Sequence, residues 1–243
     1  MILTIIIPVF NEEKTIERLL KKVVEVNLPK GIKKEIIVID DGSTDKTQKV
    51  LSEIRNSRFA RRAKFEIRVL GHDKNKGKGT AIRTGLKYAE GDYIIIQDAD
   101  LEYDPNDYNT LLELVISKKA QVVYGTRLIN YPFKILGKNK TVMPIHLLAN
   151  KFLTTFTNLL YGSKLTDMET CYKLIKSDIF KKITLKANRF DFEPEVTAKI
   201  LKLKIPIVEV SISVKPRTYK EGKKIGWLDG LVAIWILLKH KFS

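Results

Sequence analysis

The sequence has little cysteine, little histidine and no long apolar run, and each scarcity excludes a class of protein. Its 243 residues include one cysteine, Cys171, and three histidines. A single cysteine builds no disulfide framework and no cysteine-rich metal site, which favours a reducing cytoplasm. The scattered histidines show no metal-ligand spacing, so we expect them to be satisfied or surface residues. The longest apolar run, LVAIWILL at Leu231 to Leu238, is far shorter than the roughly 20 residues that span a bilayer. No signal-peptide pattern follows Met1, so we expect no secretion.

Acidic charge is also scarce, since 44 lysines and arginines face 28 aspartates and glutamates, for a formal net charge of +16. This balance favours an anionic partner: a phosphorylated substrate, an acidic lipid surface or nucleic acid. A solvated lysine-rich surface explains the same excess without a partner. The basic residues are spread along the chain and no recognised nucleic-acid motif is present, so we expect no nucleic acid. The length suits one large domain with a full core.

The first half of the chain alternates strand-like and helix-like segments. Continuous apolar, β-branched runs predict buried strands, and apolar residues at helical spacing predict the helices between them. The expected strands are 3–10, 34–40, 65–71 and 92–98, and the expected helices are 11–26, 45–55 and 79–90. The alternation predicts an α/β fold with a mostly parallel central sheet flanked by helices, and ligands at the carboxyl ends of its strands.

The second half is less regular. Its pattern predicts strands at 121–128 and 206–217, a helix at 145–162, and an amphipathic helix at 227–242 with basic residues at its end. The nearest segment to a linker is 130–144.

Four carboxylates stand at alternate positions after the last strand of the first half. Asp98, Asp100, Glu102 and Asp104 would repel one another, and a bound cation would remove that repulsion. Carboxylates at i and i+2 at a strand end supply the oxygen ligands that Mg²⁺ and Mn²⁺ prefer. An ordinary acidic turn is the alternative, because D-x-D alone is weakly specific.

Two more polar segments follow strands. Asp40 and Asp41 precede a glycine turn, where a carboxylate can accept from a ribose hydroxyl or a base N–H. An Asx turn with Asp45 as a helix cap is the alternative. Gly77 and Gly79 lie in NKGKGTAIRTG, before a helix whose amides could face phosphate. That segment lacks Walker A spacing, and a flexible turn explains it as well.

The order and spacing of IIIPVFNEE, IIVIDDGSTD, NKGKGTAIRTG and IIIQDADLEYDP resemble glycosyltransferase family 2, the inverting nucleotide-sugar transferases with a GT-A fold. In the second half, VVYGTRL, TDMETCYKLIKSDIF and the segment from FDFEPEV to GWLDG resemble the polyprenyl-phosphate sugar synthases, the dolichol-phosphate-mannose synthase-like group. The resemblance covers about 3–230. It implies a single GT-A domain, 1–243, with a nucleotide-sugar half (1–127), an acceptor-side half (128–230) and a C-terminal amphipathic helix (231–243).

The resemblance also implies roles for individual positions. Glu102 stands where dolichol-phosphate-mannose synthases commonly have Gln as a metal ligand, a departure that leaves donor and metal preference open. The implied metal ligands are Asp98, Asp100 and Glu102, with Asp100 the direct one. The implied catalytic residues are Asp98, Asp100, Asp167, Arg127 and Arg217. The implied substrate-binding residues are Pro8, Phe10, Glu12, Ile39, Asp41, Gln97, Asp98, Ala99, Arg127, Glu169, Arg217 and Lys223.

The implied reaction moves a hexose from a nucleotide sugar to a polyprenyl or dolichyl phosphate with Mg²⁺ or Mn²⁺. GDP-mannose is the favoured donor and UDP-glucose the other candidate. An acceptor phosphate whose second pKa is about 6 is largely ionised near neutral pH and needs no strong general base. A family 2 enzyme with a glycolipid, glycan or protein acceptor, and a non-enzymatic basic binding module, are the alternatives. The oligomeric state is open.

A polyprenyl phosphate is confined to a bilayer, yet no expected helix spans one. We therefore expect a cytoplasmic, peripherally membrane-associated protein that meets anionic lipid through 144–162 and 227–243. Both segments combine apolar faces with lysines, as interfacial helices do. The alternative is that both helices simply close the core.

Overall fold

One mixed sheet runs through the computed structural model, which describes residues 1–56, 67–129, 144–217 and 226–243. Its strand order is β3-β2-β1-β4-β6-β5-β7. The strands are β1 Ile2–Val9, β2 Lys33–Asp40, β3 Ile67–Gly71, β4 Tyr93–Ile96, β5 Val122–Thr126, β6 Lys173–Lys176 and β7 Val208–Ser211. The pairs β1·β2, β1·β4, β2·β3 and β5·β7 are parallel, and β6 runs antiparallel between β4 and β5. The prediction of a mostly parallel sheet is confirmed.

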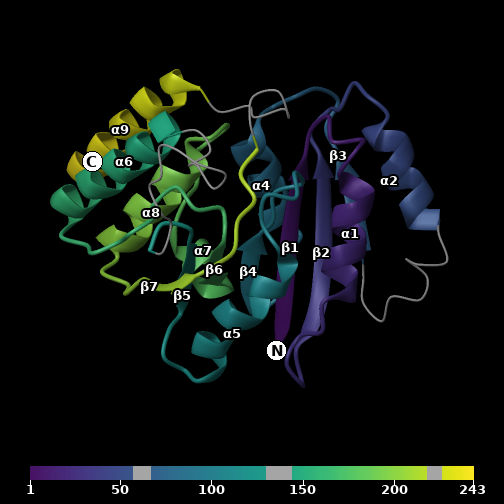
Figure 1. Cartoon of the computed structure of the whole chain (residues 1–243), viewed down its shortest axis with the longest axis horizontal. Helices are drawn as coiled ribbons and strands as arrows, with labels where there is room; N and C mark the ends of the chain where they lie inside the picture. Colours follow the sequence, from purple (N-terminus) through teal and green to yellow (C-terminus); the bar gives the residue numbers. More distant parts are fainter. Residues whose placement is uncertain (57–66, 130–143, 218–225) are drawn as a thin grey trace, which may run out of the picture.

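The helices form separate groups at the two ends of this sheet (Figure 1). Helices α1 and α2 lie beside β1–β3, α4 packs on β1 and β2, and α6, α8 and α9 pack together at the β5–β7 end. The helices are α1 Ile16–Glu25, α2 Thr47–Asn56, α4 Lys78–Leu86, the 3₁₀ turn η1 Pro105–Asp107, α5 Tyr108–Ile116, α6 Pro144–Tyr161, α7 Ser177–Lys182, α8 Phe192–Lys202 and α9 Trp227–Phe242.

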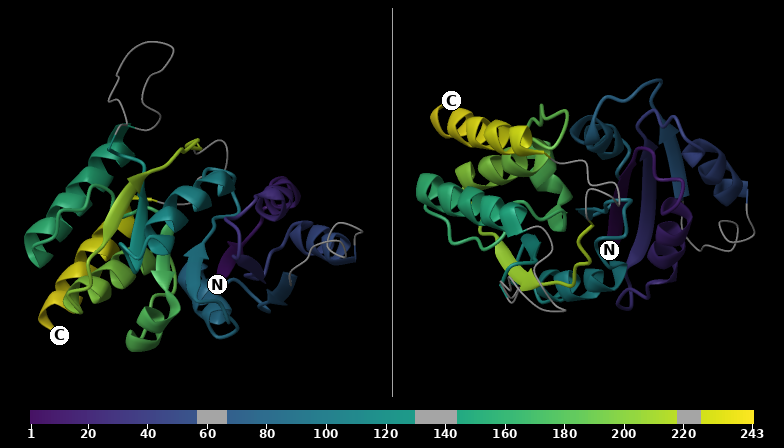
Figure 2. Two further views of the ribbon diagram at one scale, coloured as in Figure 1. Left: turned by 90° about the horizontal axis from the view of Figure 1, so that it is seen from below. Right: turned by 45° about the horizontal axis from the view of Figure 1, so that its top comes forward.

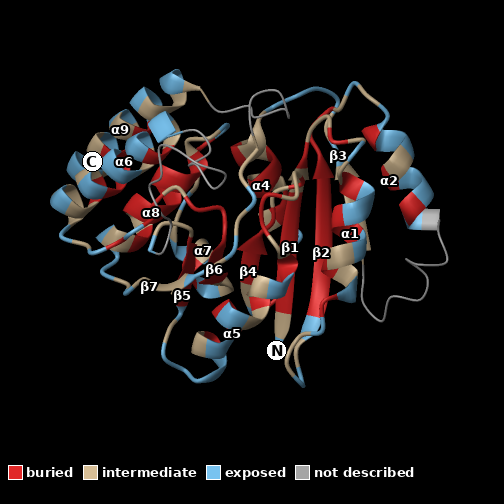
Figure 3. Ribbon diagram, in the orientation of Figure 1, coloured by how far each residue is buried: buried red, intermediate tan, exposed pale blue. Residues whose placement is uncertain are grey.

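The central strands are apolar on both faces because helices cover both faces. Ile5, Ile6 and Ile7 of β1 are fully buried, as the continuous red of β1 and β2 in Figure 3 shows. Helix α4 lies especially close to the sheet at Gly85. A Cβ there would stand 2.7 Å from Ile6 Cγ2 and 2.8 Å from Ile39 Cδ1, so a larger residue would push the helix away.

A second, smaller core lies under α6, α8 and α9. Its buried members are Leu153, Leu165, Met168, Ala198, Ala233 and Leu237. Figure 2 shows these helices side by side in both further views. Because α9 contributes two of these side chains, it is part of the fold as well as a surface element.

The sequence pattern located most elements and missed several. Strand β6 and helices α5, α7 and α8 were not anticipated, and the expected linker falls almost wholly outside the described residues. The predicted strand 206–217 was too long. Only Val208–Ser211 pairs in the sheet, and the chain then crosses toward the end of β4, where Val214 forms an isolated bridge with Tyr103. The predicted helix 11–26 begins only at Ile16, because Asn11 has a left-handed backbone with φ of 52°.

Candidate active site

The carboxyl ends of β1, β2 and β4 meet at one edge of the sheet, as parallel pairing requires. Asp41 N donates to Val9 O at 2.8 Å, and Gln97 N donates to Ile6 O at 2.9 Å, so the turns after these strands begin side by side. Asn11 joins two of the turns, because its side-chain oxygen accepts from Thr44 N at 2.8 Å. This edge is where ligands bind in open α/β sheets. The carboxylates that follow these strands therefore lie at one edge of the sheet.

Asp41 holds the glycine-lysine loop in place. Its carboxylate accepts from Lys76 N at 3.0 Å and Gly77 N at 2.7 Å, and it lies 2.6 Å from His72 Nδ1. His72 is therefore a satisfied, half-buried histidine, as predicted. Gly77 has φ of 93°, and a Cβ there would meet Asn188 O at 2.2 Å, so the loop needs glycine at this position.

Two predicted nucleotide-contacting side chains are packed inside the protein. Ile39 is fully buried in the core. Gln97 is also fully buried; its Oε1 accepts from Tyr108 and Tyr172 hydroxyls at 2.5 and 2.6 Å, and its Nε2 donates to Asp98 O. These contacts fix the turn that carries the D-x-D carboxylates, so any contact of Gln97 with a donor stays a prediction.

Asp98 is paired with a lysine that the sequence reasoning did not select. Lys78 Nζ lies 2.7 Å from Asp98 Oδ1 and 2.9 Å from Glu193 Oε1. Burial acts to raise the pKa of Asp98, but Lys78, together with Cys171 and Arg127, holds that pKa below its ordinary value. Lys78 begins α4 and Glu193 lies in the first turn of α8, so this lysine also joins the two halves of the protein. The sequence did contain a signal for Lys78, because it lies in a glycine-rich loop, but it contained no signal that its partner would be Glu193 on α8.

Asp100 lies among like charges. Burial, then the neighbouring carboxylates of Asp98 and Glu102, raise the pKa of Asp100 to about 6, although Arg217 acts to lower it. Arg217 Nη2 lies 3.0 Å from Glu12 Oε1 and 3.1 Å from Asp100 Oδ2. The predicted residues Glu12, Asp100, Glu102 and Arg217 therefore come together, from the turn after β1, the turn after β4, and the segment after β7.

These carboxylates suit a cation that is held partly by substrate. The described residues include no ready-made group of three or more His, Cys, Asp and Glu side chains that could hold a metal ion. Mg²⁺ typically takes one or two protein carboxylates and completes its shell with water and phosphate oxygens. Asp100 follows a strand end beside the carboxylates of Asp98 and Glu102, so its oxygens fit such an ion. Asp98 contacts Lys78 and Glu102 accepts from Arg217 N, so a joint three-carboxylate ligand set stays a prediction.

A separate charged pair lies at the end of β5. Arg127 Nε and Nη2 donate to the two oxygens of Asp167, each at 2.7 Å, and Arg127 N also donates to Asp167 Oδ2. Asp167 is fully buried, and although burial opposes the charge, Asp167 holds the pKa of Arg127 well above its ordinary value. Burial, followed by the Glu193 carboxylate, raises the pKa of nearby Glu169 to about 7. Glu169 Oε1 is buried without a hydrogen-bond partner among the described residues.

The remaining predicted residues are less informative. Pro8 and Phe10 are half-buried at the end of β1, and Ala99 is buried within the D-x-D turn. Lys223 lies outside the described residues. Cys171 is buried, with Sγ 3.5 Å from Ile96 O, as expected for a small buried residue.

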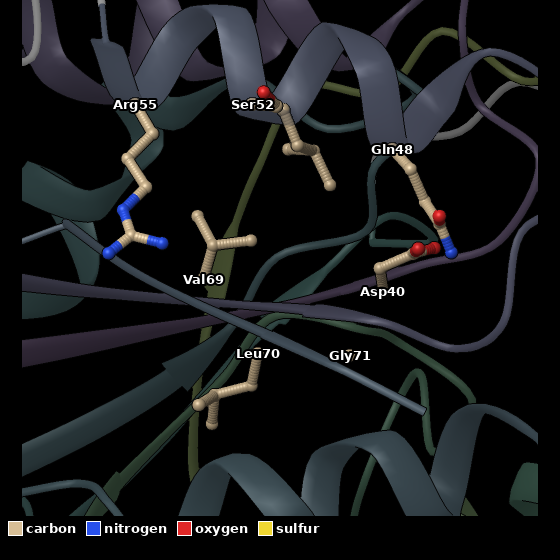
Figure 4. Close-up of a pocket in the computed structure, with 8 residues that line it drawn as sticks. Asp40, Gln48, Ser52, Arg55, Val69, Leu70 and Gly71 are labelled. Atoms are coloured by element: carbon tan, nitrogen blue, oxygen red, sulfur yellow. The ribbon is translucent and has the colours of Figure 1, made fainter. Parts of the chain in front are cut away.

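A pocket of about 460 Å³ lies away from this chemistry, between α2 and β3. Figure 4 shows Gln48, Ser52 and Arg55 on the α2 side, with Asp40 and Val69 across from them. Of its described lining residues, Asp40 was a sequence candidate for contact with a ribose or base, but Asp98, Asp100 and Arg127 do not line the pocket, so it does not by itself identify the active site.

Comparison with known proteins agrees with this geometry. The model of the family described as glycosyl transferase family 2 matches residues 4–184. A UDP-N-acetylglucosamine–dolichyl-phosphate N-acetylglucosaminyltransferase of Methanococcus voltae is 29% identical over 98% of this chain and 96% of its own. A dolichyl-phosphate beta-glucosyltransferase of Dictyostelium discoideum is 28% identical over 87% of this chain and 65% of its own. A Pyrococcus furiosus dolichol-phosphate mannosyltransferase is 31% identical over 57% of this chain and 39% of its own.

Solved structures confirm the GT-A fold. The glucosyl-3-phosphoglycerate synthase of Mycobacterium tuberculosis, crystallised with Mn²⁺, UDP and phosphoglyceric acid, aligns with a TM-score of 0.71. The alignment covers 98% of this chain and 78% of that one at 17% identity. At this identity the likeness establishes the architecture alone.

Proposed function

Because this chain belongs to glycosyl transferase family 2, we propose that it moves a sugar from a nucleotide sugar to a polyprenyl or dolichyl phosphate at a membrane surface. The observation that carries the acceptor is that three relatives with different sugars share a dolichyl-phosphate acceptor in their names. Those names include N-acetylglucosamine, mannose and glucose, so they leave the sugar open. GDP-mannose remains our favoured donor, and UDP-glucose and UDP-N-acetylglucosamine are its competitors.

The two charged groups suit the two ends of this reaction. An acceptor phosphate oxygen would attack the sugar C1 as the C1–oxygen bond to the nucleoside diphosphate breaks, and the diphosphate would leave with the electron pair. A divalent cation held by Asp100 would supply positive charge for that leaving group. Glu12, Asp98 and Asp100 line the donor side, and Lys78 keeps Asp98 ionised and oriented.

On the acceptor side, Asp167 holds the Nε–Nη2 edge of the Arg127 guanidinium through two hydrogen bonds, and the other edge, Nη1–Nη2, would bind a phosphate. A phosphate oxygen that is already ionised needs orientation more than deprotonation. We therefore assign Arg127 to acceptor binding and Asp167 to its positioning.

The membrane part of the proposal rests on an exposed apolar face of α6 and α9. Its most exposed members are Ile145, Phe152, Leu159, Trp227, Trp235 and Phe242, at 59 to 80%. None of the described helices combines the length and the apolar character that crossing a bilayer requires. Exposed aromatic and aliphatic side chains beside lysines are typical of helices that lie in the headgroup region.

A donor screen against defined acceptors tests the proposal. Purified full chain, Mn²⁺ and one radiolabelled donor at a time (GDP-mannose, UDP-glucose and UDP-N-acetylglucosamine) are incubated with polyprenyl phosphate in anionic liposomes. The expected result is sugar in the lipid phase with one donor preferred. Matched reactions contain phosphoglyceric acid or no acceptor beyond water. Transfer only to phosphoglyceric acid, or hydrolysis alone at an equal rate with and without lipid, would contradict the acceptor assignment.

A further inference from the structure

The backbone that carries Arg217 is tied to the turn that carries Asp100. Residues 213–217 leave β7 and run along that turn. Ser213 N donates to Asp107 Oδ2 at 2.9 Å, and Lys215 N donates to Glu102 O at 2.8 Å. Arg217 N then donates to Glu102 Oε1 at 3.2 Å. Arg217 is therefore held beside Asp100 whichever group its side chain contacts.

In this structure the guanidinium of Arg217 contacts Asp100, the carboxylate that would hold a cation, and also Glu12. Its Nη2 lies 3.1 Å from Asp100 Oδ2 and 3.0 Å from Glu12 Oε1. The other Asp100 oxygen, Oδ1, accepts from Glu102 N at 3.0 Å. Both Asp100 oxygens are thus engaged, and Oδ2 is engaged by a positive charge.

A guanidinium and a divalent cation do not share one carboxylate oxygen easily. Two positive groups at such a short separation repel strongly, especially in a partly buried site where water screens little. Mg²⁺ and Mn²⁺ also bind carboxylate oxygen directly. One group must therefore move when the other binds.

We infer that Arg217 is the resting counter-ion of Asp100, and that its guanidinium and a divalent cation are alternative occupants of Asp100 Oδ2. Cation binding frees the guanidinium, which then holds a phosphate of the donor or acceptor. The inference rests on the proposed function for the cation and the phosphate. It adds an order of events, since the cation creates a phosphate-binding arginine that the cation-free site lacks.

The exchange predicts that removing Arg217 changes two affinities in opposite directions. Mn²⁺ binds the nucleotide-free protein more tightly because its competitor is gone, and nucleoside diphosphate binds the Mn²⁺-loaded protein more weakly. If the guanidinium occupies Oδ2 nine-tenths of the time, the gain in Mn²⁺ affinity is about tenfold. An arginine that served only as a phosphate ligand would change the nucleotide affinity alone.

The test measures Mn²⁺ binding to the nucleotide-free full chain by electron paramagnetic resonance of free Mn²⁺. It then measures UDP and GDP binding at saturating Mn²⁺ by calorimetry. Wild type, Arg217→Gln and the control Lys215→Gln are compared. Lys215 is exposed on the same segment, so Lys215→Gln removes one positive charge without touching Asp100. The expected result is that Arg217→Gln alone binds Mn²⁺ about tenfold more tightly and binds the nucleotides more weakly than wild type.

Several outcomes would overturn the exchange. Unchanged or weaker Mn²⁺ binding in Arg217→Gln overturns it while leaving the proposed transfer reaction intact, and so does an equal gain in Lys215→Gln. An absence of Mn²⁺ binding in both wild type and Arg217→Gln overturns it together with the cation part of the proposed function. If Arg217→Gln loses its circular dichroism spectrum, the neutral variant Arg217→Met decides, because it also removes the positive charge that competes for Asp100 Oδ2. Tighter Mn²⁺ binding in that variant supports the exchange, and unchanged Mn²⁺ affinity contradicts it.

Discussion

The proposed donor side and the proposed acceptor side of the site hold buried charge in opposite ways. On the donor side, burial and like charges raise the pKa of Asp100 to about 6, despite the nearby Arg217. On the acceptor side, Asp167 raises the pKa of Arg127 well above its ordinary value and satisfies its fork at 2.7 Å. The proposed donor side thus gathers like-charged carboxylates, whereas the proposed acceptor side holds an arginine whose position is already set by Asp167. This difference suits a cation-assisted leaving group at one end and a phosphate nucleophile at the other.

The largest expected effect follows from removing the carboxylate on the donor side. Asp100→Ala should reduce sugar transfer by at least about 10³-fold, because the cation loses its direct protein ligand. The fold should survive, since a repelled charge is removed. Initial transfer rates and circular dichroism measure the two effects.

The matched control is Asp104→Ala, in the same alternating run. Asp104 accepts from Asn106 N and caps a 3₁₀ turn, so its loss should cost about 1 kcal/mol of stability but little activity. Full activity of Asp100→Ala, or full activity of the wild type in excess EDTA, would contradict the hypothesis that transfer needs a divalent cation held by Asp100.

The next effect tests whether Asp167 holds the Arg127 guanidinium in place on the proposed acceptor side. Asp167→Asn keeps the shape of the side chain but leaves the Arg127 charge without its partner. Breaking a buried pair in this way costs about 3 kcal/mol of the free energy of unfolding. Urea denaturation should show that loss, and the exposed pair Glu17–Lys21 gives the contrast, since Glu17→Gln should cost less than about 1 kcal/mol. Equal costs for the two variants would mean that Arg127 is not held by its charge partner.

Glu169 offers a pH test of the same side. Its folded pKa of about 7 lies above the ordinary value of 4.5, so between these values the folded state binds more protons than the unfolded chain. Stability should therefore fall as pH rises from about 4.5 to 7, by at most about 3 kcal/mol. Glu169→Gln should flatten that part of the pH profile, whereas the exposed Glu53→Gln should leave it unchanged. A slope that persists in Glu169→Gln would assign the titration to another group.

The sequence predicted the carboxylates at the strand ends better than it predicted their partners, for a physical reason. Donor-side carboxylates follow buried parallel strands, and local apolar patterns locate such strands and their ends. Their partners were not predictable, because Lys78 meets Glu193 across 115 positions, and no local pattern records which helix packs there. The crossing segment before Arg217 was mistaken for a strand since its alternation continues past the last sheet pairing at Ser211. The sequence pattern located helix α6 well. Because its apolar residues lie on two faces, the pattern did not predict which face is exposed.

The smallest expected effect concerns the outer face of the acceptor side. Deleting 231–243 is an unsuitable test, because it would remove Ala233 and Leu237 from the second core. The structure offers exposed positions instead: Trp235 on α9 and Phe152 on α6, at 63 and 59% exposure. The double variant Trp235→Ser and Phe152→Ser should bind anionic liposomes about tenfold more weakly, because less apolar surface enters the headgroup region. Nucleotide affinity should be unchanged.

Ile116→Ser, at an apolar position of similar exposure (49%) on α5, is the control and should leave flotation unaltered. Flotation at low and high salt separates the two contributions, since salt screens attraction to the lysines but not apolar insertion. Equal flotation of all three proteins would mean that α6 and α9 do not form the membrane contact.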